Sequence, residues 1–416
     1  METLKPVRGT QDTLPKESRI YRLIEETAYK VARRYGFEEI DIPIFEFSEV
    51  FSRTLGDYSD IVTKEMYTFV DKGGDTITLR PEGTAGIARA FISNGLQHSL
   101  PLKLFYKGPM FRYERPQKGR RRQFRQVGVE VLGVHDYQAD IEIISLASNF
   151  LTELGLKNEL TLELNSLGDN ESRMIYKKTL LNYLTKHKNK LSRDSLNRLK
   201  NNPLRILDSK DLGDRDIISD APKIVDSLNY DSKQFFENLC VNLEKLNISF
   251  KHNMNLVRGL DYYCHTAFEF TSTNLGAQGT VLAGGRYDGL INQMGGPDTP
   301  GIGWAAGIER LALLTKSKDE EIRPIAVIPI DLDNNIDALK IAENLRRHGF
   351  NIELGYNGNI KKRMKRANEN NCIAAILLGT EEMKNNTVTL KDMDSGLQKE
   401  VSQLKLEKYL DIYKRG

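Results

Sequence analysis

The chain has 416 residues, 39% hydrophobic and 28% charged, and a net charge of +3. This length suits two or three domains that each bury a core, and the composition is that of an ordinary globular protein. A membrane protein is not expected, because the longest apolar runs, such as residues 373–378, are far shorter than the roughly 20 residues that a span needs.

The N-terminus lacks the apolar segment of a secretory signal, and the three cysteines, Cys240, Cys264 and Cys372, lie far apart. We therefore expect reduced thiols and a cytoplasmic protein. The histidines form no ligand spacing such as HExxH, so no structural zinc is expected. Neither a P-loop nor a GxSxG motif occurs.

The first elements are a helix and a strand. Apolar residues at helical spacing from Ile20 to Tyr35 predict a helix that ends near Gly36. The alternation of Ile40, Ile42 and Ile44 predicts a strand, and Pro43 restricts it to a sheet edge or a strand end. Such an edge is suited to pairing with another subunit.

Further elements follow in chain order. MYTFV and TITLR flank the turn DKGGD and predict a hairpin, after which PEGTAG leads into a short helix over 85–94. Two long strands are predicted over 102–114 and 122–134, joined by an arginine-rich loop. Residues 135–156 predict a helix with Asp136 near its start and Gly155 at its end.

The second half begins with a helix-rich segment over about 170–250. Strand patterns return in LVRGLDYY (256–263), TAFEFTST (266–273) and TVLAGGRYDG (280–289), and residues 301–314 pass from strand to helix. The charged residues 317–323 before Pro324 are typical of a linker. Beyond them strands and helices alternate, as in a parallel α/β domain.

Residues 111–130 carry six Arg and one Lys against two Glu, a net charge of +5. A period of two directs Val127, Val129 and Val131 into a core and Gln126, Gly128 and Glu130 to the opposite face, where we expect the glycine to leave room for a ligand. The facing strand should place Arg112 and Glu114 on a common side. The loop cations Arg115, Lys118, Arg120, Arg121 and Arg122 suit phosphates. An exposed face with routine cross-strand ion pairs is the alternative, but it leaves the glycine and the loop charge unexplained.

These segments resemble known motifs. FRYERPQKGRRRQF resembles motif 2 of the class II aminoacyl-tRNA synthetases, GIGWAAGIERL resembles motif 3, and the helix and strand over about 20–44 resemble motif 1. LVRGLDYY, AGGRYDGL and TLRPEGTAG resemble the signatures of histidyl-tRNA synthetases in particular. The resemblance runs from Lys5 to the C-terminal domain.

The resemblance implies an α+β catalytic domain over 1–322 with a mixed or antiparallel sheet. Motif 2 would span about 102–134, motif 3 about 301–315 and a helical insertion about 170–250. A C-terminal α/β anticodon-binding domain would span 323–416. The implied assembly is a homodimer without membrane attachment.

The implied activity is that of a histidine–tRNA ligase, which activates L-histidine with ATP to histidyl-adenylate and transfers it to histidine tRNA, leaving AMP and pyrophosphate. Arg112 and Arg258 match the catalytic arginines on the α-phosphate. The residues implied for ATP are Arg112, Glu114, Arg120, Phe124 and Arg310. Mg²⁺ would bind with ATP, with no metal ligand expected from protein side chains and no organic cofactor.

For histidine the resemblance implies Glu82, Gly83, Thr84, Gln126, Glu130, Arg258, Tyr262, Tyr263 and Tyr287. A carboxylate and a phenol can satisfy both nitrogens of an imidazole, which suits Glu130 and Tyr263. Glu82 suits an ammonium group, although PEGT could equally cap a helix. The motif 3 glycines would let the backbone approach adenine.

Arg115 and Gln117 match positions near the tRNA acceptor end, whereas Arg121 and Arg125 have no role that the resemblance supplies. The basic run KKRMKR (361–366) suits either RNA phosphates or a solvated helix face.

Two other functions remain open. A histidine-binding paralogue that regulates ATP phosphoribosyltransferase would not charge tRNA, but such proteins lose the LVRGLDYY arginine, motif 2 and the anticodon domain, all of which are retained here. A synthetase for threonine or proline would lack Glu130, Tyr263 and the LVRGLDYY signature.

Overall fold

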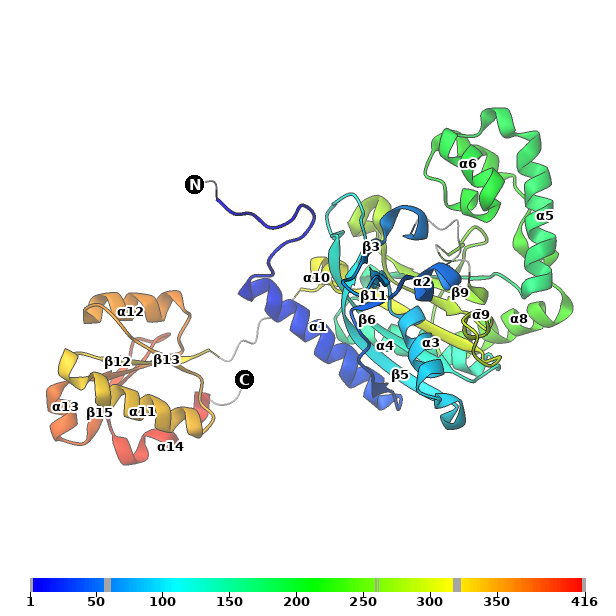
Figure 1. The fold of residues 1–416 in the computed structure, drawn as a ribbon. Coiled ribbons are helices and arrows are strands. Elements are labelled where there is room, and N and C mark those ends of the chain that lie inside the picture. Colours follow the sequence, from blue (N-terminus) through cyan, green and yellow to red (C-terminus); the bar gives the residue numbers. More distant parts are fainter. Residues whose placement is uncertain (1–2, 56–60, 259, 261, 317–322, 414–416) are drawn as a thin grey trace. The chain divides into compact units, whose positions relative to one another are not determined.

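The computed structural model describes the chain except for residues 1–2, 56–60, 259, 261, 317–322 and 414–416 (Figure 1). It divides into two compact units, Met1–Lys316 and Ser317–Gly416. Apart from Arg323, the linker predicted over 317–323 lies outside the described residues. No helix in the described ranges is long and apolar enough to cross a membrane.

The first unit is built on an eight-stranded sheet in the order β1-β5-β6-β11-β10-β9-β7-β8. The β1–β5 and β7–β8 pairs are parallel and the others antiparallel, as the predicted mixed sheet requires. The strands are β1 Glu38–Glu39, β5 Leu102–Phe111, β6 Gln123–Leu132, β7 Thr161–Ser166, β8 Lys251–His252, β9 Cys264–Thr271, β10 Thr280–Arg286 and β11 Gly301–Gly307.

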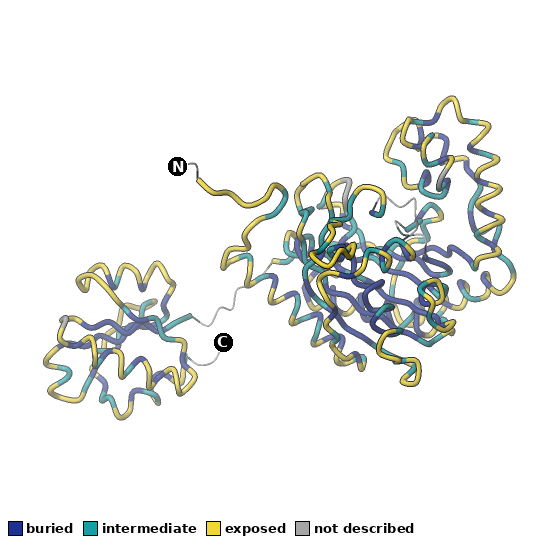
Figure 2. Tube along the Cα trace, viewed as in Figure 1, coloured by how far each residue is buried: buried dark blue, intermediate teal, exposed yellow. Residues whose placement is uncertain are grey.

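The two faces of β6 have different neighbours, as its alternation predicted. Val127, Val129 and Val131 are buried in a core with the helices α1 Pro15–Arg34, α4 Gln138–Glu153 and α10 Ile308–Leu314. Figure 2 shows the strands of this sheet mainly in dark blue, the colour of buried residues. Gln126 and Glu130 face the other way, toward a pocket. Arg112 and Glu114 lie beyond the end of β5, in the loop, and not within a strand as predicted.

A second, three-stranded sheet has the order β2-β4-β3. Its strands are β2 Phe45–Phe47, β3 Tyr67–Val70 and β4 Thr76–Leu79, and the helices nearby are α2 Ser48–Leu55, α3 Thr84–Ser93 and α9 Leu290–Gln293. The hairpin predicted around DKGGD is therefore confirmed. The strand predicted over 40–44 is wrong, because the carbonyls of Ile42 and Ile44 accept hydrogen bonds from Arg80 and make no strand ladder.

The predicted insertion consists of four α-helices with short 3₁₀ segments between them. They are α5 Asn170–Lys186, α6 Arg193–Asn201, α7 Leu212–Ser219 and α8 Tyr230–Lys245, and α5 and α6 lie in the green lobe of Figure 1. The buried carboxylate of Asp214 accepts hydrogen bonds from the hydroxyls of Ser192, Ser195 and Ser209, at 2.6–2.7 Å. This carboxylate thus joins α6 and α7 within a segment of weak hydrophobic pattern.

The second unit has a five-stranded sheet in the order β13-β12-β14-β15-β16. The predicted parallel arrangement holds for the first three strands only, because β15 and β16 are antiparallel. The elements are β12 Ile325–Pro329, α11 Asn335–Arg347, β13 Ile352–Leu354, α12 Ile360–Glu369, β14 Ala374–Leu378, α13 Thr380–Lys384, β15 Thr387–Asp392, β16 Gln398–Ser402 and α14 Leu406–Leu410. In the basic run on α12, Arg363 is buried and bonds the carbonyl of Pro329, so it is not part of an exposed basic face.

Candidate active site

A cavity of about 990 Å³, partly open to solvent, lies against the polar face of the large sheet. Most of the predicted substrate residues line it although they come from five separate segments of the chain. They are Glu82, Thr84, Arg112, Glu114, Arg120, Phe124, Gln126, Glu130, Arg258, Tyr262, Tyr263, Tyr287 and Arg310. Gly83, Arg115 and Gln117 do not line it.

Glu130 lies at the closed end of this cavity with 1% of its surface exposed. Thr84 Oγ1 donates to Glu130 Oε1 at 2.7 Å, and the Tyr287 hydroxyl donates to Oε2 at 2.5 Å. Burial raises the pKa of Glu130 to about 8, although these two hydrogen bonds oppose the rise. The site therefore presents a carboxyl group that takes up or releases a proton close to neutral pH.

Glycine in motif 3 makes space for this carboxylate. Gly303 in β11 is paired with Glu130 in β6, and a Cβ at Gly303 would overlap the carboxylate and the Val129 carbonyl. The glycine is thus required by close approach of an acid from the neighbouring strand, a role distinct from the predicted approach of backbone to adenine.

The space at Gly128 is filled by protein. Tyr106 lies opposite Gly128 across the β5–β6 ladder, and its ring occupies the place where a Cβ would stand. The prediction that this glycine leaves room for a ligand is therefore wrong, because a cross-strand aromatic ring covers the glycine instead. Tyr106 is fully buried and also packs on Gly83. The pairing of a long aromatic strand with a glycine-containing strand is the only sequence signal for it.

Glu82 forms hydrogen bonds at the start of α3. Its two oxygens accept from the backbone N–H groups of Thr84 and Ala85 at 2.7 and 2.8 Å. These donors have no partner within the helix, so the carboxylate caps it, as the alternative interpretation of PEGT proposed. Burial raises the pKa of Glu82, and the backbone hydrogen bonds and Arg112 oppose the rise.

Arg258 is held by an acid that the sequence did not single out. Its Nη1 pairs with Glu269 Oε1 in β9, and Thr280 Oγ1 donates to Glu269 Oε2 at 2.7 Å. The guanidinium lies 5.1 Å from the ring centroid of Tyr263. The described residues of 256–263 form a loop and not the expected strand; Gly259 and Asp261 lie outside the described residues. The only hint of Glu269 was an acid within an otherwise apolar strand.

Arg112, which directly follows β5, lines the same cavity. Its Nε donates to the Pro81 carbonyl at 2.8 Å, and its guanidinium lies 5.4 Å from the centroid of the Phe124 ring. Arg120 Nη1 lies 3.0 Å from Glu114 Oε2, and Arg310 Nη1 donates to the Thr280 carbonyl at 2.5 Å.

Other arginines of the segment face the N-terminal region. Arg121 pairs with Glu17 at 2.7 Å and Arg125 with Glu25 at 2.6 Å, both on α1. The Arg122 N–H donates to the Gly9 carbonyl at 2.8 Å. These contacts give Arg121 and Arg125 the roles that the sequence left open. The basic segment thus has cations that line the cavity and cations that contact the N-terminal segment and α1, and Arg121 does both.

Arg115 and Gln117 of the loop do not line the cavity, whereas Gly119 and Arg120 do. Gln117 and Arg120 form an antiparallel bridge across Gly119, and Arg115 and Gln117 are exposed. Within the described part of the chain, no three His, Cys, Asp or Glu residues come together as metal ligands. The acids Glu114 and Glu269 in the cavity region are already paired with arginines.

Comparison with known proteins agrees with this architecture. A family model described as histidyl-tRNA synthetase matches residues 9–311, and one described as anticodon binding domain matches residues 325–411. The histidine–tRNA ligase of Rhodospirillum rubrum is 58% identical over 99% of both chains. The solved structure of apo S. aureus histidyl-tRNA synthetase has a TM-score of 0.82 and 35% identity, and covers 98% of this chain and 99% of that one.

A second solved structure shares the fold alone. It is described as an ATP phosphoribosyltransferase regulatory subunit/histidyl-tRNA synthetase from Bacillus halodurans C, with a TM-score of 0.65 and 23% identity over 87% of this chain and 97% of that one. The fold class predicted from the sequence is confirmed by the two closer matches. Because the family model covers most of the chain and a relative matches nearly all of it, the chain belongs to the histidyl-tRNA synthetase family.

Proposed function

We propose that this protein is a histidine–tRNA ligase that forms histidyl-adenylate from L-histidine and ATP and transfers the histidyl group to histidine tRNA. The observation that carries the proposal is one cavity lined by two guanidinium groups, Arg112 and Arg258, and by the Glu130 carboxyl with its two hydroxyl donors. The two guanidinium groups suit a phosphate, and the carboxyl group with its hydroxyl donors suits an imidazole.

In the first step a carboxylate oxygen of histidine attacks the α-phosphorus of ATP, and the bond to pyrophosphate breaks. In the second step the terminal ribose hydroxyl of the tRNA attacks the activated carbonyl, and AMP leaves. Both nucleophiles belong to substrates, so the protein supplies positioning and charge stabilisation. Arg112 and Arg258 would hold the α-phosphate, each contributing about 3–4 kcal/mol to the transition state.

For ATP we assign Glu114 and Phe124 to the adenine and Arg120 and Arg310 to the outer phosphates. Both arginines are held toward the cavity by oxygen partners that a phosphate could replace. Mg²⁺ is assigned to the phosphates of ATP, since the described residues offer no ligand cluster and the nearby acids pair with arginines. No step is assigned to the metal.

For histidine we assign Glu130 and Tyr263 to the imidazole, with Tyr287 positioning the Glu130 carboxyl and Tyr262 packed against both tyrosine rings. Gln126 Oε1 is buried and accepts no hydrogen bond from the described residues, as expected for a group that awaits a polar ligand. Glu82, Gly83 and Thr84 would form the α-amino end, with the Glu82 oxygens shared between helix and ligand.

The tRNA is assigned to two regions. The exposed loop tip with Arg115 and Gln117 would meet the acceptor end, and the second unit would bind the anticodon. Lys361, Lys362, Lys365 and Arg366 remain exposed on α12 and suit RNA phosphates. A cytoplasmic location is part of the proposal and is consistent with three free cysteines.

A homodimer is also proposed, with the outer face of the β2-β4-β3 sheet as its interface. Phe45, Phe47 and Phe69 are all exposed there. A cluster of large apolar side chains is typical of a protein interface.

The regulatory function is less supported. Its histidine site would not need two arginines around a phosphate, whereas Arg112 and Arg258 line one cavity here. A chain that carries both this cavity and a second unit that matches an anticodon binding domain fits the charging of tRNA better.

The test is exchange of labelled pyrophosphate into ATP by the purified protein. Exchange should require histidine and should not occur with threonine or proline, because only an imidazole matches the Glu130 site. Exchange that depends on another amino acid, or its absence in a protein that still binds histidine, would refute the proposed activity.

A further inference from the structure

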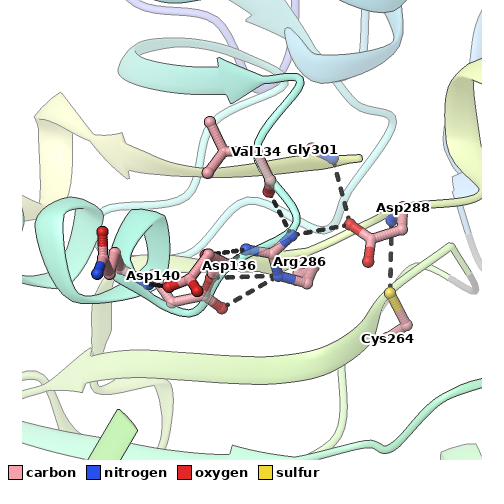
Figure 3. Close-up of polar contacts among 8 residues, drawn as sticks. Val134, Asp136, Asp140, Cys264, Arg286, Asp288 and Gly301 are labelled. Atoms are coloured by element: carbon pink, nitrogen blue, oxygen red, sulfur yellow. Dashed lines mark hydrogen bonds and ion pairs between the residues drawn. The ribbon is translucent and has the colours of Figure 1, made fainter. Parts of the chain in front are cut away.

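Behind the imidazole site, Arg286 is fully buried at the end of β10. Its Nη2 and Nε donate to the Asp140 carboxylate on α4, and Nη2 also donates to the Asp136 carbonyl (Figure 3). Its Nη1 donates to the Val134 carbonyl at 2.9 Å and to Asp288 Oδ1 at 3.1 Å. Every nitrogen of the guanidinium is therefore engaged by a partner on α4, on the segment before it, or on Asp288.

The next residue along the chain is Tyr287, whose hydroxyl donates to Glu130. The β9–β10 ladder shifts register between Gly285 and Arg286, so beyond this point regular pairing continues only with β11, through Arg286 and Ile302. Tyr287 N–H then donates to the Gly301 carbonyl at 2.7 Å, and Gly301 N–H donates to Asp288 Oδ1 at 3.3 Å. Tyr287 is thus fixed on both sides by contacts that converge on Arg286 and Gly301.

The ring of Tyr287 has little freedom within this frame. It occupies the space where a Cβ of Gly301 would stand, and it lies edge-on to Tyr262 with ring centroids 5.8 Å apart. A shift of the Arg286–Asp288 segment would therefore move the hydroxyl relative to Glu130.

Stability alone is a weak reason for this arrangement. Removing two charges from water costs about as much as their attraction returns, so buried ion pairs add little net stability, although breaking one is costly. A rigid planar guanidinium with fixed partners does, however, define the position of the chain to which it is attached.

We propose that Arg286, held by Asp140 and Asp288, is a positioning residue that sets the Tyr287 hydroxyl on the Glu130 carboxyl and so determines the affinity for the imidazole of histidine. The inference rests on the proposed role of Glu130 and Tyr287. Arg286 acts without touching the substrate.

The experiment is a double-mutant cycle read by histidine-dependent pyrophosphate exchange. Arg286→Lys keeps the charge but loses the planar fork, and Asp288→Ala removes the partner that is 29% exposed and so is the milder change. Each is made alone and with Tyr287→Phe, and rates are normalised to active sites. Asp394→Ala is the matched control, because Asp394 pairs with Arg323 in the second unit.

We expect Asp288→Ala to raise KM for histidine about tenfold and to leave KM for ATP within about twofold, a coupling ordinary for residues in one network. In the Tyr287→Phe background its effect on histidine should fall below about twofold, since the hydroxyl it positions is gone. Asp394→Ala should change neither constant.

The outcomes separate the two levels of the proposal. If Tyr287→Phe alone leaves KM for histidine unchanged, the proposed imidazole site is wrong. If Tyr287→Phe raises it but Arg286→Lys and Asp288→Ala do not, or if their effects are the same in both backgrounds, the positioning role is overturned. The result for Arg286→Lys counts only if that variant folds, whereas Asp288→Ala tests the positioning role by itself.

Discussion

Glu82 and Glu130 line the same cavity, yet their carboxyl groups are satisfied in different ways. Both oxygens of Glu82 accept backbone N–H groups of α3, whereas Glu130 receives two side-chain hydroxyls. The desolvation cost of burial is therefore partly offset for both; burial still raises both pKa values, that of Glu130 to about 8. Its protonation state is thus a measurable property of histidine binding.

The pH dependence of histidine binding follows from this pKa. Free imidazole loses its proton near pH ~6.5, while empty Glu130 keeps its proton until about pH 8. If the bound pair shares one proton, binding needs no proton exchange between these values. Below pH ~6.5 both groups are protonated, so binding must release a proton; above about pH 8 neither is protonated, so binding must take one up. We therefore expect a bell-shaped pH dependence of kcat/KM for histidine, with limbs of up to about tenfold per pH unit.

Glu130→Gln is the control for the alkaline limb, because the amide does not titrate. The fall that begins near pH 8 should disappear in this variant, while any fall caused by the amino group of histidine remains in both proteins. A wild-type kcat/KM that instead rises above pH 8 would show that the ionised carboxylate binds neutral imidazole, contrary to the shared proton.

At the scale of elements, α1 holds the base of the basic loop. Arg121–Glu17 and Arg125–Glu25 join the loop to the helix, and the Glu309 carboxylate on α10 accepts the Arg125 N–H at 3.0 Å. The same loop brings Arg120 to the part of the cavity that is assigned above to ATP. We therefore predict that the helix contributes to ATP binding as well as to the core.

Breaking one of these pairs should affect ATP selectively. Glu17→Gln should raise KM for ATP about three- to fivefold, equivalent to the ~1 kcal/mol of a partly exposed ion pair, and leave KM for histidine unchanged. The exchanged pair, Glu17→Arg with Arg121→Glu, should recover part of the loss. Steady-state pyrophosphate exchange measures both constants.

Arg34→Gln is the matched control, because Arg34 pairs with Glu153 at the far end of the same helix. An equal effect of Arg34→Gln on ATP would mean that the helix acts only through general stability. Failure of the exchanged pair to recover any ATP binding would contradict a charge-dependent anchor.

The elements that were predicted correctly are those set by local pattern. α1, the β3–β4 hairpin, β5, β6 and α4 have strong periodicity and clear turn residues, and are confirmed. The strands predicted over 40–44 and 256–263 are wrong because carbonyls within them accept from side chains of distant residues and not from a neighbouring strand. Arg80 takes the Ile42 carbonyl, and Asn165 donates to the Leu256 carbonyl at 2.9 Å.

The same distinction applies to the site. The alternation in β6 predicted that Gln126 and Glu130 share a face, and both line the cavity. Tyr106, Glu269 and Arg286 were missed, because each acquires its role from a contact with a residue on another element or loop. The alternation within one strand shows which of its side chains share a face. Which residues of the neighbouring strands lie beside them follows only from the order and register of the strands in the sheet.

At the scale of the whole molecule, the β2-β4-β3 sheet exposes its apolar face and buries its polar face. Phe47 and Phe69 both pair with Ile77, so these three side chains share one face, and 61% and 46% of the two phenylalanines is exposed. The other face is polar and packed inward: Glu46 is buried against Arg89, and Thr78 bonds Ser48 and Thr68. An apolar outer face over a polar inner one is expected where a second copy of the chain covers it.

Charge on that face should separate the subunits. Phe47→Asp with Phe69→Asp should convert a species of twice the chain mass into a monomer in sedimentation velocity, because each carboxylate would have to be buried without a partner. Leu212→Asp is the matched control, since Leu212 is exposed on α7 in the insertion. It should leave the dimer intact. A wild-type monomer would contradict the proposed dimer, and a dimer that survives both aspartates would place its interface on another surface.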